Sequence, residues 1–299
     1  MKTNKLFTGI IIAFMGFYLP TSAQNLLEKL ENEFPKTHQI EIATFKTTRI
    51  GLGHSIETRS KGALEIAMYN RYWNIPDFDG QRFLADKVST RFSLEYSITD
   101  RFTFGGGYTN FDKITDGFLK YRLIRQLKGS RKAPMSITLL QTISHLNTNG
   151  TGLYPGATPL GEYGYSTQVL VARKFNPKFS AQISPTYIRR KAASSSNNPT
   201  DQFAIGFGGR HKVGGHVSIV SEYFYVMNPL KSIDTYNAFS VGVNWELSHL
   251  MLQFQVTNAR NFADDTFITR TTNNFNFEDG NFHFGFNATF VLHTRKKKL

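Results

Sequence analysis

Charged side chains at alternating positions are the residues of this sequence best placed to do chemistry. In the segment 88–98, Arg91 and Glu95 share one parity with serines, while the other parity is apolar. Fixed charges of this kind could line a passage and select ions, as rings of basic side chains do in pores. The same alternation elsewhere predicts an inward-facing set of six basic and three acidic residues, namely Glu65, Arg71, Arg91, Glu95, Lys120, Arg122, Lys174, Arg210 and Glu222.

This charged set has two physical interpretations. A basic excess in an open lumen would favour the passage of anions. Alternatively, the charges satisfy one another in a closed network that conducts nothing, as the interiors of small barrels commonly do. We favour a narrow or plugged lumen, because residues 24–61 precede the alternating segments and are available as a plug. The predicted lumen-lining residues are Arg91, Glu95, Lys120, Arg122, Arg210 and Glu222.

Other site chemistries have less support in the sequence. The eight histidines are scattered and form no short ligand pair, so we interpret them as polar residues near strand ends and predict no metal site. Ser144, His145 and Asn147 provide the residue types of a hydrolase, but consecutive strand residues point to opposite faces. The glycine clusters at 105–107 and 206–209 start no helix, so they predict strand curvature or close packing and no cofactor site.

The elements that must carry these residues alternate with a period of two. In the segment 282–292, one face is apolar, with four phenylalanines beside Ala288 and Leu292, and the other is mostly small or polar. Segments of this kind recur, each close to the roughly 9–11 residues of a tilted membrane-spanning strand. They predict an all-β fold, a closed antiparallel transmembrane β-barrel of about 12 strands that follows a short N-terminal helical or irregular segment. The expected strands are 63–73, 88–98, 102–109, 117–126, 134–144, 165–175, 179–189, 202–211, 216–225, 237–245, 250–257 and 281–293.

The lengths of the connections support a membrane barrel. Long and short gaps alternate, except that 110–116 and 127–133 are nearly equal. Outer-membrane barrels have short periplasmic turns and long outer loops, with both termini periplasmic. The long gaps 145–164, 190–201 and 258–280 are therefore expected to be outer loops. A soluble secreted β-sandwich would not explain this asymmetry.

The N-terminus has the features of an export signal. Two lysines precede an apolar stretch at 6–19 and small residues follow it, so we predict a signal peptide over 1–23. The predicted organisation continues with a periplasmic extension or lumen plug over 24–61, the barrel over 62–293 and a basic tail over 294–299. The sequence contains 0 Cys, which excludes disulfides and thiolate metal ligands.

The net charge of +13 indicates anionic partners. For an exported protein, the phosphates of outer-membrane lipid and lipopolysaccharide are favoured over nucleic acid. The other expected partners are the barrel-assembly machinery, a small solute and a periplasmic partner protein. The expected location is the outer membrane of a Gram-negative bacterium.

A set of short motifs follows in order along the chain. They are ATFKTTR at 43–49, GHSIE at 53–57, YSITDR at 96–101, DGFLKY at 116–121, ARKF at 172–175, PTY at 185–187 and FHFGFN at 282–287. In this order and spacing they resemble an uncharacterised family of Bacteroidota outer-membrane β-barrel proteins, known only as a domain of unknown function. The resemblance covers residues 43–292 and implies a barrel in a Gram-negative outer membrane. It implies no substrate and no catalytic residue.

The sequence therefore predicts an outer-membrane barrel that acts as a narrow or plugged passive channel or transporter for small solutes, with anions favoured by the basic excess. A non-conducting structural or partner-binding barrel is the alternative. An outer-membrane hydrolase is less favoured, and no enzyme activity, catalytic residue or cofactor is predicted.

Overall fold

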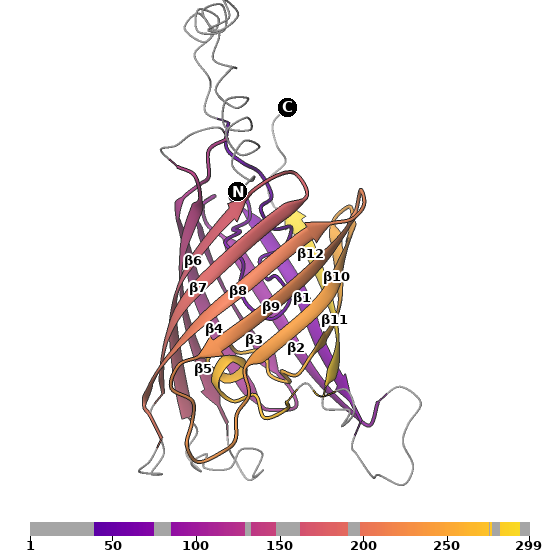
Figure 1. The fold of residues 1–299 in the computed structure, drawn as a ribbon. Helices are drawn as coiled ribbons and strands as arrows, with labels where there is room; N and C mark the ends of the chain where they lie inside the picture. The colour runs from indigo at the N-terminus through magenta and orange to yellow at the C-terminus, as the bar shows by residue number, and fades with distance from the viewer. Residues whose placement is uncertain are drawn as a thin grey trace, which may run out of the picture. The chain divides into compact units, whose positions relative to one another are not determined.

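The backbone closes into a ring of antiparallel strands. The computed structural model describes residues 39–74, 85–128, 133–147, 162–190, 198–274, 276 and 282–293. These residues form 12 strands that pair with their sequence neighbours, and β1 pairs with β12 to complete a closed barrel, as Figure 1 shows. The predicted barrel is confirmed. The strands are β1 (Ala63–Trp73), β2 (Lys87–Ser97), β3 (Phe102–Thr109), β4 (Ile114–Ile124), β5 (Ser136–Leu146), β6 (Glu162–Lys174), β7 (Phe179–Arg190), β8 (Asp201–Lys212), β9 (Val217–Val226), β10 (Ala238–Leu247), β11 (Leu250–Thr257) and β12 (His283–His293).

Several expected features lie outside the described residues. They are the signal peptide over 1–23, the N-terminal helical segment and the basic tail over 294–299. The described strands all belong to one unit, which begins at Ile40. Across the described ranges, no helix is both long and apolar enough to cross a bilayer.

Neighbouring side chains along each strand face opposite sides of the barrel wall. On β2, Phe92 and Leu94 are 59% and 57% exposed, whereas Arg91 and Ser93 are buried. The outward rows are apolar and the inward rows are mostly polar, which is the reverse of a soluble core. Since a charge on the lipid face of a barrel costs about 2–4 kcal/mol near the midplane, this parity is strongly specified.

Tight turns gather at one end of the barrel, which we call the turn end, and the longer connections gather at the opposite loop end. Side chains cap the tight turns. The Asn176 side-chain oxygen accepts hydrogen bonds from the backbone N–H groups of Lys178 and Phe179, at 2.9 and 2.8 Å. Thr99 accepts from Phe102 in the same way, at 3.0 Å. Local Asx-type and Thr turns therefore position the strand ends.

The strands β4 and β5 differ from the sequence expectation by two or three residues. They span Ile114–Ile124 and Ser136–Leu146, where 117–126 and 134–144 are expected. The loop-end connection before β4 is a tight turn in which Lys113 adopts a positive φ of 51°. Of the two connections that flank β4, the one before it at the loop end is the shorter, and the one after it at the turn end is the longer. This pair is an exception to the general pattern, and the shifted strand ends explain why the two gaps looked equal in the sequence.

The parity of β2 gives a direct test. We expect Leu94→Arg to destabilise the folded barrel by roughly 2–4 kcal/mol, because the guanidinium would lie on the lipid face. Leu94→Phe keeps an apolar side chain there and should fold like the wild type. The free energy of unfolding in lipid vesicles, measured by urea titration, checks both. Equal stability of the arginine and phenylalanine variants would contradict the outward position of Leu94.

Candidate functional site

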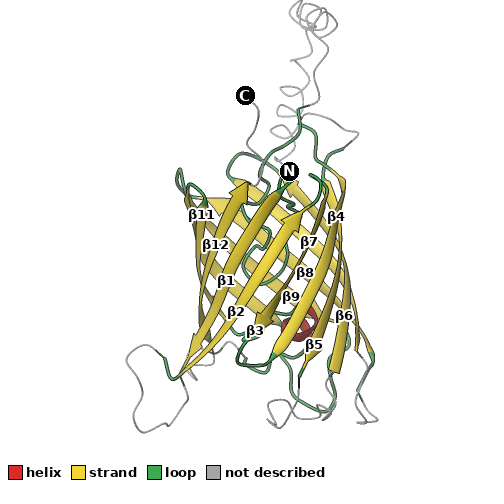
Figure 2. Cartoon of the chain, turned by 180° about the vertical axis from the view of Figure 1, so that it is seen from behind, coloured by secondary structure: helices red, strands yellow, loops and turns green. Residues whose placement is uncertain are grey.

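A hairpin lies inside the lumen, visible as the loop within the strands in Figure 2. We call residues 44–57 the lumen hairpin; they are buried for most of their length. Arg49 and His54 pair across it in an antiparallel bridge. The Ile50 N–H donates to the Gly53 carbonyl at 3.0 Å, which closes the tip. The remaining backbone N–H and C=O groups of such a turn face the barrel wall, so side chains of the wall must supply their hydrogen-bond partners.

A wall carboxylate holds the tip of the lumen hairpin. Glu222 of β9 accepts hydrogen bonds from the backbone N–H groups of Leu52 at 2.5 Å and Gly53 at 3.1 Å. Hydrogen bonds to a charged group contribute about 1.5–3 kcal/mol each. Gly53 must be glycine here, because a Cβ would lie 2.7 Å from the Phe224 ring. Glu222 therefore fixes the tip against the inner face of β9.

Three of the predicted basic residues also hold the lumen hairpin. Lys120 donates to a hairpin carbonyl at 3.0 Å. Arg122 donates to a second carbonyl at 3.2 Å and pairs with Glu57 of the hairpin at 2.7 Å. Arg210 donates to the carbonyl of Ala43, just before the hairpin, at 3.4 Å. These groups bind the backbone of the inserted segment.

The remaining two predicted residues have other surroundings. Arg91 donates twice to Asp116 of β4, at 2.7 and 2.5 Å, so the wall itself neutralises this cation. Glu95 is 1% exposed, and within the described residues neither of its carboxylate oxygens has a hydrogen-bond partner. It stands opposite Glu65 in the pairing of β1 with β2. A role for the six predicted residues in a passage stays a prediction.

The lumen hairpin has an apolar face. Its side chains Phe45, Ile50 and Ile56 belong to one buried cluster, which also contains inward residues of β4, β5, β6 and β9. Burying a large apolar side chain contributes about 1.5–3 kcal/mol. The apolar side chains of the hairpin are therefore part of the barrel core, while its backbone meets polar and charged wall residues, several of them on the same strands β4 and β9.

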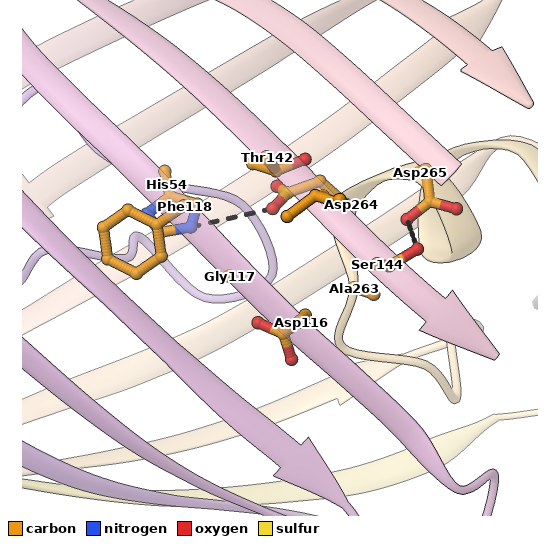
Figure 3. A pocket seen from close by; sticks show the side chains of 10 residues that line it. His54, Asp116, Gly117, Phe118, Thr142, Ser144, Ala263, Asp264 and Asp265 are labelled. Atoms are coloured by element: carbon orange, nitrogen blue, oxygen red, sulfur yellow. Dashed lines mark hydrogen bonds and ion pairs between the residues drawn. The ribbon is translucent and has the colours of Figure 1, made fainter. Parts of the chain in front are cut away.

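A second segment fills the lumen from the loop end. Residues 258–271, which we call the lumen loop, follow β11 and include the short helix α3 (Asp264–Thr269), whose six residues are all buried. Asp265 of α3 accepts hydrogen bonds from Ser144 of β5 at 2.7 Å and from Arg190 of β7 at 2.5 Å. Figure 3 shows the Ser144 contact. The wall thus anchors this segment through a buried ion pair.

The expectation of an exposed outer loop over 258–280 is wrong for residues 258–271. The physical reason is apolar content that only burial can satisfy. Phe267 is 0% exposed, and its ring packs edge-on against Phe224 with the centroids 5.1 Å apart. Phe262 and Ile268 are buried with it. These apolar residues are the signal in the sequence that could have identified an inserted segment.

The lumen hairpin and the lumen loop meet at Arg49, His54 and Asp264. Figure 3 shows His54 and Asp264 facing each other. Arg49 donates to His54 Nε2 at 2.9 Å, and a guanidinium has no acceptor, so the imidazole is the accepting partner. Asp264 lies 3.6 Å from that nitrogen. Burial, assisted by Arg49, lowers the pKa of His54 well below its usual value. Burial also raises the pKa of Asp264, against the opposing effect of Arg49.

The residue types of a hydrolase are not assembled at Ser144. Its hydroxyl donates to Asp265, while His145 points to the opposite face and stacks on Tyr163 with the ring centroids 4.5 Å apart. In the part of the chain that the structure describes, no group of three or more His, Cys, Asp or Glu could hold a metal ion.

A cavity of about 300 Å³ opens at the turn end beside the lumen hairpin. We call it the vestibule. Lys46 and Arg59 line it from the hairpin side, and Thr289 and His293 of β12 line it from the wall. Lys46 also forms an ion pair with Glu246 of β10 at 3.0 Å. The hairpin therefore leaves space on the side of β10 to β12, where its apolar face does not pack.

Comparison with known proteins agrees with this architecture. Residues 45–292 match the family described as "Membrane bound beta barrel domain (DUF5777)". The chain belongs to this family. No curated protein matches the chain.

Solved structures with a similar fold are outer-membrane channels and porins. An outer membrane channel from Pseudomonas putida F1 is 15% identical, covering 79% of this chain and 98% of its own, with a TM-score of 0.44. The KdgM porin is 8% identical, with 77% and 99% covered and a TM-score of 0.46. The NanC porin is 7% identical, with 78% and 100% covered and a TM-score of 0.45. Likeness at this level has no bearing on function.

This membrane-bound barrel resides in an outer membrane, because closed barrels with an even number of antiparallel strands are the spanning form found there. The predicted location is confirmed in that respect. The family description specifies no substrate.

The alternation argument missed four acidic residues of the filled lumen. Glu57, Asp264 and Asp265 come from inserted segments, and Asp116 lies in the part of β4 that precedes the expected strand. Each lies within 4 Å of a basic group. These carboxylates pair with individual cations of the filled lumen, but the basic excess remains, because the inserted segments also contain Lys46, Arg49, Arg260 and Arg270.

The anchor of the lumen loop gives a pH-dependent prediction. Burial alone would raise the pKa of Asp265, but Arg190 and the Ser144 hydrogen bond lower it below its usual value. A carboxyl group with a depressed folded pKa contributes stability above its unfolded pKa of about 3.9, and this is lost as the pH falls through the folded value. We expect Asp265→Asn to destabilise the protein by about 3 kcal/mol at pH 7.

The difference between the unfolding free energies of wild type and Asp265→Asn should stay constant from pH 7 to about pH 5 and narrow below about pH 4. Urea unfolding in detergent at several pH values measures it. Asp264→Asn is the matched control, and it should lose less stability at pH 7 because burial raises the pKa of Asp264. A difference for Asp265→Asn that does not narrow below about pH 4 would contradict the ion pair.

Proposed function

We propose that the protein is a plugged passive channel or transporter for small solutes, closed in this state by the lumen hairpin. The observation that supports this most is the vestibule of about 300 Å³ at the turn end. A barrel whose only task is structural has no need of a polar cavity between an inserted segment and the wall. The size is at the lower end of the range for small-molecule sites.

The contacts beneath the vestibule suit a gate. On the side of β11, Gln253 donates to the carbonyl of Ile50 at 2.8 Å, and its oxygen accepts from Asn287 of β12 at 3.2 Å. Neutral hydrogen bonds of this kind contribute only about 0.5–1.5 kcal/mol each, because water or a solute can replace them. The apolar face of the hairpin stays on the opposite wall. Opening therefore requires a shift of the hairpin tip and not its expulsion.

A non-conducting structural or partner-binding barrel is the second candidate. It is favoured by the lumen hairpin and the lumen loop together, because the two inserted segments meet inside the barrel at Arg49 and Asp264. A hydrolase has less support, since Ser144 bonds to Asp265.

Conductance of the full chain in planar bilayers separates the first two candidates. We expect the wild type to be mostly closed with brief openings, and Glu222→Gln to increase the open fraction roughly tenfold, since it removes the charge from two hydrogen bonds that hold the tip. Glu95→Gln is the matched control, because within the described residues Glu95 has no hydrogen bond to the hairpin. No conductance in any of the three proteins would favour the structural barrel.

A further inference from the structure

One interior cation makes its hydrogen bonds, within the described residues, to neutral groups alone. Arg71 of β1 is 1% exposed, and within the described residues its hydrogen-bond partners are the carbonyl of Asn70 at 2.9 Å and the side-chain amides of Asn287 and Gln255. Arg91 and Arg122, by contrast, each pair with a carboxylate. Glu222 acts on Arg71 only from beyond ion-pair distance, and a buried cation with no carboxylate in contact is unfavourable. The surroundings of Arg71 therefore suit an anion.

The amides around Arg71 occupy the positions that a carboxylate would take. With its oxygen turned towards Arg71, Gln255 accepts from Nη1 at 3.1 Å and from Nη2 at 2.9 Å. Asn287 accepts from Nη1 at 3.1 Å. A guanidinium fork matches the two oxygens of a carboxylate. Side-chain amides can also turn over and present NH₂ donors to an anion.

The backbone makes room for this arrangement. Gly285 of β12 stands opposite Arg71 in the strand pairing. A Cβ at Gly285 would lie 2.8 Å from Nη1 of Arg71 and 2.6 Å from Cγ of Gln255. Below the guanidinium, the Phe262 ring of the lumen loop lies 4.8 Å from its central carbon. Gly285 thus leaves room beside the guanidinium, and the Phe262 ring lies within cation–π distance of it.

We propose that Arg71, with Gln255 and Asn287, forms a binding site for a small carboxylate anion. The inward row of β12 leads from the vestibule to this site. Thr289 lines the vestibule, and Asn287 and then Gly285 lie successively deeper in the barrel on the same face of the strand. An anion in the vestibule would meet these amides before the guanidinium. The inference rests on the proposed function for this route of entry.

Acetate is the probe, and thermal unfolding of the full chain in detergent is the measurement. A ligand that binds only the folded protein raises the Tm. We expect a rise of roughly 2–4 °C once acetate exceeds its Kd several-fold, and no such rise with acetamide, which has the same shape without the charge. Arg71→Gln should abolish the acetate effect. Lys174→Gln, which removes a cation paired with Glu41, should keep it.

Three results would overturn the proposal: no rise of the wild-type Tm with acetate, an equal rise with acetamide, or an equal rise in Arg71→Gln. If Arg71→Gln does not fold, Arg71→Lys decides, because it keeps the charge but loses the fork, and its acetate shift should be clearly smaller than that of the wild type. An acetate shift in a protein that never conducts would contradict the proposed function but leave the site intact. Conductance without an acetate shift of the Tm would contradict the carboxylate site but leave the proposed function intact.

Discussion

A chain segment that enters a barrel carries backbone N–H and C=O groups into a place where no strand pairs with them. Each unpaired group would lose its hydrogen bonds to water without replacement, at a cost of about 1–3 kcal/mol. The interior of this barrel solves the problem with long polar side chains of the wall. Glu222 accepts from the hairpin tip, Lys120 and Arg122 donate to its arms, and Gln253 donates on the side of β11. The charged interior is therefore first a set of partners for inserted backbone.

The same constraint explains the division of the lumen. Where the wall presents apolar residues such as Leu140 and Leu170, the hairpin packs Phe45 and Ile56 against them. Where β11 presents Gln253, the contact with the hairpin is a single neutral hydrogen bond, and the vestibule lies at the turn end on the side of β10 to β12. A solute path, if the hairpin tip shifts, belongs to this polar side.

Period-two alternation was sufficient to predict the strands, their outward faces and the closure of the barrel, because lipid on one side forces the parity of Phe92 and Leu94. Alternation also identified Lys120, Arg122 and Glu222 as inward residues. Alternation could not show what these residues bind, since their partners are mainly backbone N–H and C=O groups of residues 44–57. Every residue has such groups, so the sequence does not distinguish them. The burial of 258–271 was missed because a long connection between strands resembles an outer loop by length alone. Only its apolar residues, such as Phe267, distinguish it.

Amide hydrogen exchange tests the central claim most directly. If wall side chains hold the lumen hairpin, peptides that cover residues 48–57 should be protected in the full-length wild type to a degree similar to the strands. In Glu222→Gln this protection should fall at Leu52 and Gly53, while the strand peptides stay protected. Fast exchange of these residues in the wild type, comparable with an exposed loop, would contradict the account, because it would mean that the hairpin is not held inside the barrel.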